Sequence, residues 1–141
     1  MDFSLKIIEI KGELEKVGHQ VNIPYFTQKI INGEILFDDY LKQKEAGGDI
    51  GMRNAEPTDM IRRYWDYIKG SDAILVLNMT KKGIQNYIGG SVLMEMGFAY
   101  GFGRKIFLYN PIPEKGEKMH YVDEVLDMKP TVINGDLLLI S

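Results

Sequence analysis

The chain has 141 residues and a formal net charge of −3 at pH 7, with 45% hydrophobic and 26% charged residues. This composition is ordinary for a globular protein. At this length we expect one domain, residues 1–141, that buries about two thirds of its unfolded surface. The acidic balance argues against binding to a nucleic-acid polymer, which requires a basic surface, and favours a small-molecule ligand.

Membrane, secretory and metal-binding signals are all missing from the sequence. No apolar run reaches the length of about 18 residues that suggests a membrane span, and the N-terminus lacks the basic start and cleavage site of a signal peptide. We therefore expect a cytoplasmic protein without membrane contact. The chain has no cysteine and two histidines, so we expect no disulfide, no metal site and no cofactor.

The beginning of the chain predicts a helix followed by a strand. Apolar residues at helical spacing predict a helix over residues 3–17, with Asp2 or Ser4 as its N-cap and Gly18 as its stop. The next residues, 20–24, predict a short strand.

The following stretch predicts a helix, a long loop and another helix. Residues 34–44 have helical character, whereas residues 45–57 contain three glycines, a proline and no periodicity. Such a segment predicts a loop that is often a lid or disordered. Thr58 then caps a helix that Gly70 ends. The apolar stripe of this helix consists of Ile61, Tyr64, Trp65 and Ile68.

The centre of the chain predicts a strand, a helix and a second strand. The first strand covers residues 72–78, the helix opens near Ser91 with its hydroxyl as the cap, and the second strand covers residues 105–109. The remaining predicted elements are a short helix over 121–126, a strand over 131–133, a turn at Asn134–Gly135 and an apolar end over 136–140.

Strands that alternate with helices predict a mainly parallel sheet covered on both faces, which is an α/β three-layer sandwich. The continuously apolar residues 73–77 support this fold, because a strand buried on both sides does not alternate. A doubly wound domain normally begins with a strand, whereas this chain begins with a helix, so the usual first strand is missing. Residues 20–24, residues 136–140 or a second protomer are the candidates to fill the gap. We favour a start at an internal methionine as the origin of this missing strand.

The loop before the central helix is a candidate anion site. Gly89 and Gly90 provide flexible backbone, and Ser91 provides a hydroxyl at the helix N-terminus. The free N–H groups and the positive end of the helix dipole there suit a phosphate or a carboxylate. A plain turn followed by an N-cap is the structural alternative.

Glu95 is the only charged residue between Ser91 and Gly103. A solvated helix face normally carries several polar residues, so a lone carboxylate one turn past a possible anion site suggests a functional placement. The alternative is a glutamate that stabilises the helix N-terminus. Asn78 and Asn110, which follow the two central strands, could each hydrogen-bond a base or a sugar, or hold a turn.

The segments SDAILVLN and IGGSVLMEMGFAYGFGRKIFLYNPIP resemble the nucleoside 2-deoxyribosyltransferase superfamily, which includes the 2'-deoxynucleoside 5'-phosphate N-hydrolases. The resemblance implies a flavodoxin-like fold, a homo-oligomer, and action on the N-glycosidic bond of a deoxynucleoside or its monophosphate. Glu95 matches the nucleophile of that family, and Ser91 approximates a residue that lines the sugar or phosphate site. Neither a metal nor another cofactor is implied.

The sequence departs from the family in two places. The family's additional aspartate corresponds to Tyr64, a phenol that could donate a hydrogen bond to the leaving base but is a weak acid near neutral pH. The missing first strand removes a loop that contributes to the family's sugar and phosphate site. The alternative function is therefore a catalytically inactive module that binds a nucleotide or a partner on the same fold.

Overall fold

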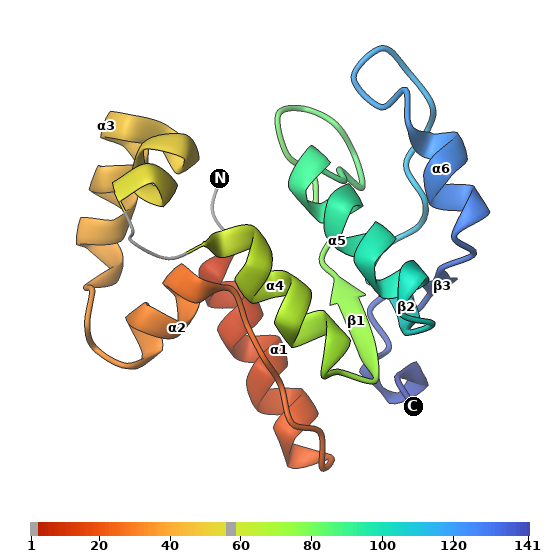
Figure 1. Ribbon diagram of the computed structural model, residues 1–141, viewed down its shortest axis with the longest axis horizontal. Helices are drawn as coiled ribbons and strands as arrows, with labels where there is room; N and C mark the ends of the chain where they lie inside the picture. Colours follow the sequence, from red (N-terminus) through yellow and green to blue (C-terminus); the bar gives the residue numbers. More distant parts are fainter. Residues whose placement is uncertain (1–2, 56–58) are drawn as a thin grey trace. The chain divides into compact units, whose positions relative to one another are not determined.

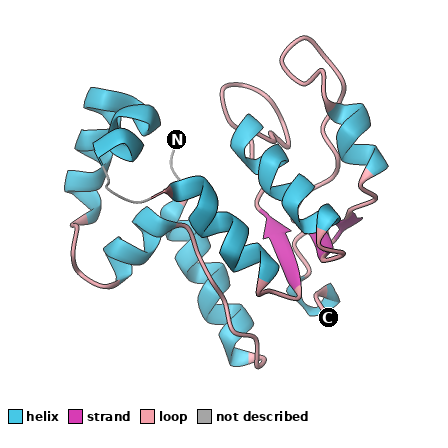
Figure 2. Cartoon of the chain, viewed as in Figure 1, coloured by secondary structure: helices cyan, strands magenta, loops and turns pink. Residues whose placement is uncertain are grey.

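The computed structural model describes the backbone of residues 3–55 and 59–141. The chain divides into two compact units, Met1–Met60 and Ile61–Ser141, which are described separately here. Figure 1 labels their elements and Figure 2 distinguishes helices from strands. None of the helices in the described ranges is long and apolar enough to cross a membrane.

The first unit consists of three helices: α1 (Ser4–Lys16), α2 (Tyr25–Ile31) and α3 (Phe37–Ala55). The prediction of α1 is confirmed, and Gly18 ends it with φ +97°, a backbone conformation that glycine adopts without strain. Ser4 is not the N-cap, because it is the first helical residue and lies buried with its Oγ 3.4 Å from Oγ1 of Thr27. The other predicted cap, Asp2, lies outside the described residues.

The strand predicted over residues 20–24 is wrong, because these residues form no strand and Pro24 is the N-cap of α2. A strand requires a partner that a local apolar pattern does not reveal. The loop predicted over 45–57 is also wrong as far as residue 55, because α3 extends from Phe37 to Ala55. Glycine weakens a helix without forbidding it, and the sequence has no proline between Pro24 and Pro57 to stop the helix. Residues 56–57 lie outside the described ranges.

The second unit begins at Ile61, the second residue of α4 (Met60–Lys69), and contains a strand–helix–strand unit made of β1 (Ala73–Val76), α5 (Gly90–Gly101) and β2 (Lys105–Leu108). The prediction for this region is confirmed within two residues at each boundary except the start of α4, whose predicted cap, Thr58, is not among the described residues. The elements that follow are α6 (Val122–Asp127), β3 (Thr131–Val132) and the 3₁₀ helix η1 (Leu137–Leu139).

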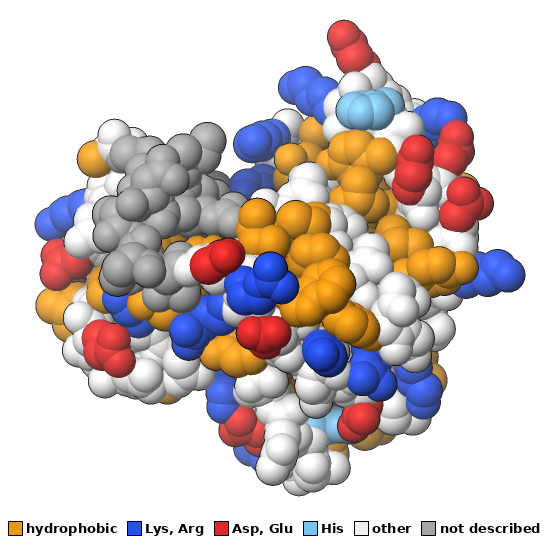
Figure 3. Space-filling model, in the orientation of Figure 1, with side chains coloured by type: hydrophobic (Ala, Val, Ile, Leu, Met, Phe, Trp, Pro, Cys, Tyr) orange, Lys and Arg blue, Asp and Glu red, His pale blue; other side chains and the backbone are white. Residues whose placement is uncertain are grey.

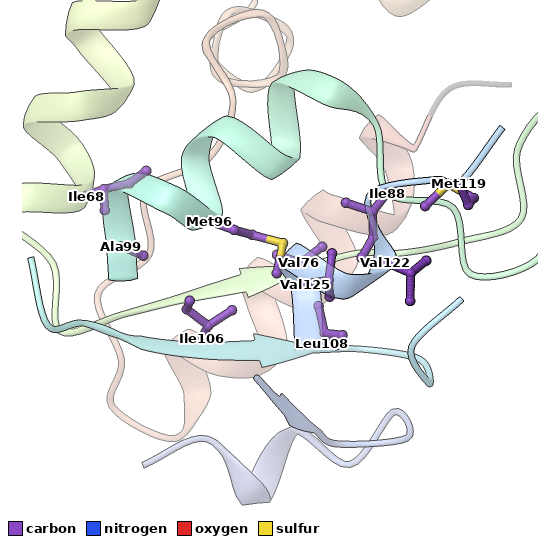
Figure 4. Close-up of a cluster of buried hydrophobic side chains, with 10 residues drawn as sticks. All are labelled: Ile68, Val76, Ile88, Met96, Ala99, Ile106, Leu108, Met119, Val122 and Val125. Atoms are coloured by element: carbon purple, nitrogen blue, oxygen red, sulfur yellow. The ribbon is translucent and has the colours of Figure 1, made fainter. Parts of the chain in front are cut away.

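The three strands form one parallel sheet in the order β1-β2-β3. This arrangement confirms a parallel α/β architecture for the second unit. Figure 4 shows α5 and α6 packed on the sheet, with Met96 of α5 and Val125 of α6 pointing toward Val76 and Leu108. Because Met96, Val125 and Leu108 are completely buried, this cluster is the core that positions the loops at the carboxyl ends of β1 and β2.

The end of the chain turns away from the sheet after β3. Asn134 and Gly135 have φ values of +48° and +78°, which confirms the predicted turn. The carboxylate of Asp136 then accepts a hydrogen bond from the Leu138 amide at 3.1 Å and caps η1. Residues 136–140 therefore form a short helix and do not fill the place of a missing strand.

The outer edge of β1 has no strand beside it in the described part of the chain. The amides of Lys105 and Tyr109 donate to the carbonyls of Asp72 and Val76, so the even-numbered residues of β1 pair with β2. Backbone polar groups alternate in direction along a strand. Those of Ala73 and Leu75 therefore point to the unpaired edge.

Candidate functional site

The carboxyl ends of β1 and β2 are joined by the side chain of Asn78, which is completely buried. Its Nδ2 donates to the carbonyls of Asn110 and Pro111, each at 2.9 Å, and its Oδ1 accepts from the Asn110 amide at 2.8 Å. In return, Nδ2 of Asn110 donates to the Asn78 carbonyl at 3.2 Å. These bonds form a clamp between the two strand ends, which we call the asparagine clamp.

The asparagine clamp accounts for the structural role that the sequence left open for Asn78 and Asn110. Both N–H groups of the Asn78 amide are already used, and the side chain has no exposed surface. A substrate would have to open the clamp before it could reach Asn78. Asn110 is only partly buried, and a substrate-binding role for it stays a prediction.

The N-terminus of α5 is formed by the two glycines of the loop. Gly89 is the N-cap in an extended conformation (φ −78°, ψ 166°), and Gly90 is the first helical residue. Ser91 is therefore not the cap, contrary to the prediction, and its exposed side chain makes no capping hydrogen bond. Gly89 takes the extended backbone that an N-cap residue typically has, so the helix starts one residue earlier and Ser91 lies in its first turn.

The first turn of α5 is open on the side where an anion would bind. In the described ranges, the amides of Gly90, Ser91 and Val92 have no protein acceptor. A Cβ atom on Gly90 would meet nothing within 4 Å, whereas one on Gly89 would lie 3.4 Å from the ring of Tyr87. Unpaired amides at a helix N-terminus attract negatively charged groups.

Two loops border this helix start. Residues 79–87 form a hairpin in which Lys82 and Gly83 have φ values of +54° and +74°, and the Tyr87 amide donates to the Met79 carbonyl at 3.1 Å. The ammonium group of Lys82 lies 5.9 Å from the centre of the Tyr87 ring, within the range of a cation–π contact. The ring of Tyr87 thus contacts both the ammonium group of Lys82 and Gly89, the N-cap of α5.

Tyr121 connects the second loop to the same helix start. Its hydroxyl donates a short hydrogen bond to the carbonyl of Ile88, directly before Gly89. Burial raises the pKa of Tyr121, and the neighbouring Tyr87 raises it further. Because the phenol stays protonated, it keeps donating the bond that fixes Ile88. No pattern in the sequence points to this role, since Tyr121 has no periodic or motif context.

Glu95 lies on the side of α5 that faces α4. It is partly buried and is the only charged residue of α5. Residues 95, 98 and 102 follow helical spacing and share one face. On that face, the rings of Phe98 and Phe102 lie 4.9 and 4.6 Å from the ring of Trp65, measured between centroids.

The same contact determines how α4 presents its side chains to α5. Tyr64 is one residue before Trp65, so helical geometry rotates it by about 100° from the side chain that contacts α5. Tyr64 is also four residues before Ile68, a buried core residue, and shares that face of α4. Tyr64 is partly buried, and its role as the group that assists the leaving base stays a prediction.

Hydrophobic side chains gather on the visible face of the second unit over α5 and α6, with charged residues at the rim (Figure 3). Tyr100, a residue of α5, is 60% exposed. The described ranges contain no group of three or more His, Asp or Glu side chains that could hold a metal ion. A site on this unit therefore combines an apolar surface, one carboxylate and the open start of α5.

The chain matches no protein-family model, no curated protein and no solved structure. The resemblance to the nucleoside 2-deoxyribosyltransferase superfamily consequently depends on the residues of this sequence alone, loosely over residues 3–24 and more closely over residues 58–113.

Proposed function

We propose that the chain acts on the N-glycosidic bond of a deoxynucleoside or its 5'-monophosphate, with Glu95 as the nucleophile. The observation that carries this proposal is the placement of Glu95, which is partly buried and is the only charged residue of α5. It lies five residues after Gly90, which corresponds to a rise of about 7.5 Å along the helix. A nucleotide with its phosphate at the open helix start would place its sugar near this carboxylate.

The reaction proceeds in two displacements at the anomeric carbon. A carboxylate oxygen of Glu95 attacks this carbon, and the bond to the base nitrogen breaks with its electron pair leaving on the base. The base takes up a proton, for which Tyr64 is the proposed donor. Water then attacks the same carbon, loses a proton and releases the Glu95 carboxylate. A second nucleobase in place of water gives transfer.

The proposal includes a flavodoxin-like sandwich, a cytoplasmic location and a homo-oligomer. The parallel order β1-β2-β3 with α5 on the sheet supports this fold, because a flavodoxin-like domain is an open parallel sheet covered by helices. Such sheets bind ligands at the carboxyl ends of their strands. Light scattering tests the oligomer, and a monomer at high protein concentration would contradict it.

A nucleotide-binding module without catalysis is the second candidate. The asparagine clamp favours it, because the Asn78 amide at the carboxyl end of β1 is already bonded to backbone. In this case the open α5 start would bind the nucleotide, and Glu95 would contribute only to binding.

The release of free base from a panel of deoxynucleosides and their monophosphates tests the enzyme proposal. Glu95→Gln keeps the shape of the side chain but removes the nucleophile, and we expect the rate to fall by about 10³-fold or more. Glu124→Gln is the matched control, because Glu124 is an exposed acid of α6, and its rate should equal that of the wild type.

Thermal shift measurements with the same panel separate the two candidates. Stabilisation by nucleotides without any base release supports the binding module. Equal base release by the wild type and the Glu95→Gln variant would refute the nucleophile. No stabilisation and no release with any compound would refute both candidates.

A further inference from the structure

A hollow lies where β2 and β3 begin. This is the end of the sheet opposite to the candidate site at the carboxyl ends of β1 and β2. Its volume is about 420 Å³, within the range of about 300 to 1,000 Å³ that small-molecule sites occupy. The amino ends of two parallel strands and the segment after α6 form its walls. Its lining includes Arg104, Lys105, Phe107, Met128, Lys129 and Leu139.

Three cationic side chains line this hollow together with Ser141, the last residue of the sequence, and no Asp or Glu side chain lines it. Within the described ranges, Arg104, Lys105 and Lys129 form no ion pair with an Asp or Glu side chain. Adjacent cations in a concave surface create a positive potential that attracts an anion. The local charge is therefore opposite to the net negative charge of the whole chain.

The guanidinium of Arg104 is held in place by the backbone. Its Nη2 donates to the Lys69 carbonyl at 2.7 Å, and its buried Nε has no hydrogen-bond partner in the structure. A guanidinium fixed in this way loses little conformational freedom when it binds a phosphate or a carboxylate. The Nζ atom of Lys105 makes only longer contacts, at 3.4 Å to the carbonyl and 3.2 Å to the hydroxyl of Ser141, which a ligand could replace.

Lys129 occupies a backbone position that favours glycine. Its φ is +53°, and its amide donates to the Leu126 carbonyl at 3.0 Å, which closes the end of α6. Glycine or asparagine is the usual residue in this left-handed conformation. This bond fixes the backbone position from which the Lys129 side chain joins the other two cations in the lining of the hollow.

The hollow also has an apolar wall. Phe107, Met128 and Leu139 line it beside the cations, and 52% of Leu139 is exposed. Ligand sites typically combine apolar side chains with a few polar groups that orient the ligand. This lining suits a ligand that carries an aromatic or aliphatic body in addition to its charge.

We propose that this hollow binds a phosphate monoester with an apolar body. Three cations match the charge of a phosphate dianion better than that of a carboxylate, and the apolar wall contacts the organic part of the ligand. The site is separate from the one proposed at the carboxyl ends of β1 and β2, and it does not depend on that function.

Phenyl phosphate is the probe, and the Nε–H signal of Arg104 in the NMR spectrum of the full chain is the readout. We expect a saturable shift with a dissociation constant of about 0.1 to 1 mM, as for a ligand of this size. Lys129→Gln should weaken binding about fivefold, and Lys105→Gln should do the same if Lys129→Gln disturbs the end of α6. Lys118→Gln, an exposed lysine in the loop before Tyr121, is the control and should bind like the wild type.

Benzoate and inorganic phosphate separate the two parts of the ligand. Both should bind more weakly than phenyl phosphate, benzoate for lack of a second charge and inorganic phosphate for lack of a ring. The absence of a saturable shift up to about 10 mM would overturn the proposal. Equal weakening by Lys129→Gln and Lys118→Gln, or tighter binding of benzoate, would also overturn it.

Discussion

Replacing Asn78 with alanine should destabilise the second unit strongly. The substitution removes two hydrogen bonds donated by Nδ2 and one accepted by Oδ1, and it leaves the Asn110 amide and two carbonyls without this partner. At about 1 kcal/mol net for each bond, the free energy of unfolding should fall by about 3 kcal/mol. This is a large part of the 5 to 15 kcal/mol that is typical of a domain.

The single tryptophan of the chain makes this loss measurable. Trp65 packs against Phe98 and Phe102, so its fluorescence reports the unfolding of the second unit. With a urea slope of about 1.5 kcal/mol/M, the midpoint of the Asn78→Ala variant should fall by about 2 M. Gln85→Ala, at an exposed position of the hairpin 79–87, should shift it by less than about 0.5 M.

Equal midpoints for the Asn78→Ala and Gln85→Ala variants would refute the reasoning. They would mean that the hydrogen bonds of the asparagine clamp stabilise the folded state no more than the bonds to water that the same groups make in the unfolded chain stabilise that state. A lower midpoint together with a changed urea slope would instead indicate that the folded state has loosened around the carboxyl ends of β1 and β2.

Three further predictions concern single hydrogen bonds and backbone angles. Tyr121→Phe removes the bond to the Ile88 carbonyl and should lower the free energy of unfolding by about 1 to 2 kcal/mol in urea titrations. Because the folded pKa of Tyr121 lies above the unfolded value of 10.0, its stabilisation should persist below pH 10 and diminish as the pH rises through the folded pKa. Urea midpoints of the wild type between pH 8 and about 11 should show this loss, and those of Tyr121→Phe should lack it. Gly90→Ala, where a Cβ meets open space, should raise the melting temperature slightly, whereas Gly135→Ala at φ +78° should lower it by an amount equivalent to about 1 kcal/mol.

The sequence predicted the central elements well because their signals are local. The apolar run of β1, the glycines before α5 and the apolar start of β2 each depend on neighbours in the chain, and their boundaries agree within two residues. Residues 20–24, QVNIP, alternate polar and apolar side chains but have no described strand partner, so this local signal was misleading. The helix α3 continues through its glycines because no proline interrupts it. Apolar periodicity alone does not predict this continuation.

The site was predictable only in part, for the same reason. Glu95 stands out in the sequence as the single charge of its helix, and the structure places it on α5 as expected. The side that it faces follows only from the contacts of Phe98 and Phe102 with Trp65, which are 33 and 37 residues apart in the chain. The bond from Tyr121 to Ile88 spans a similar distance and has no local signature.

The unpaired edge of β1 limits the ways in which copies of this sheet can join. The opposite edge belongs to β3, which has two residues and follows Pro130, a residue that cannot donate a backbone hydrogen bond. Within the described residues, only β1 therefore offers a strand edge long enough for another strand to pair with. A sheet with one such edge can pair with one other copy across a twofold axis. No long strand edge is then left for a third copy. Edge pairing of this unit consequently ends at a closed pair and cannot continue into a fibre.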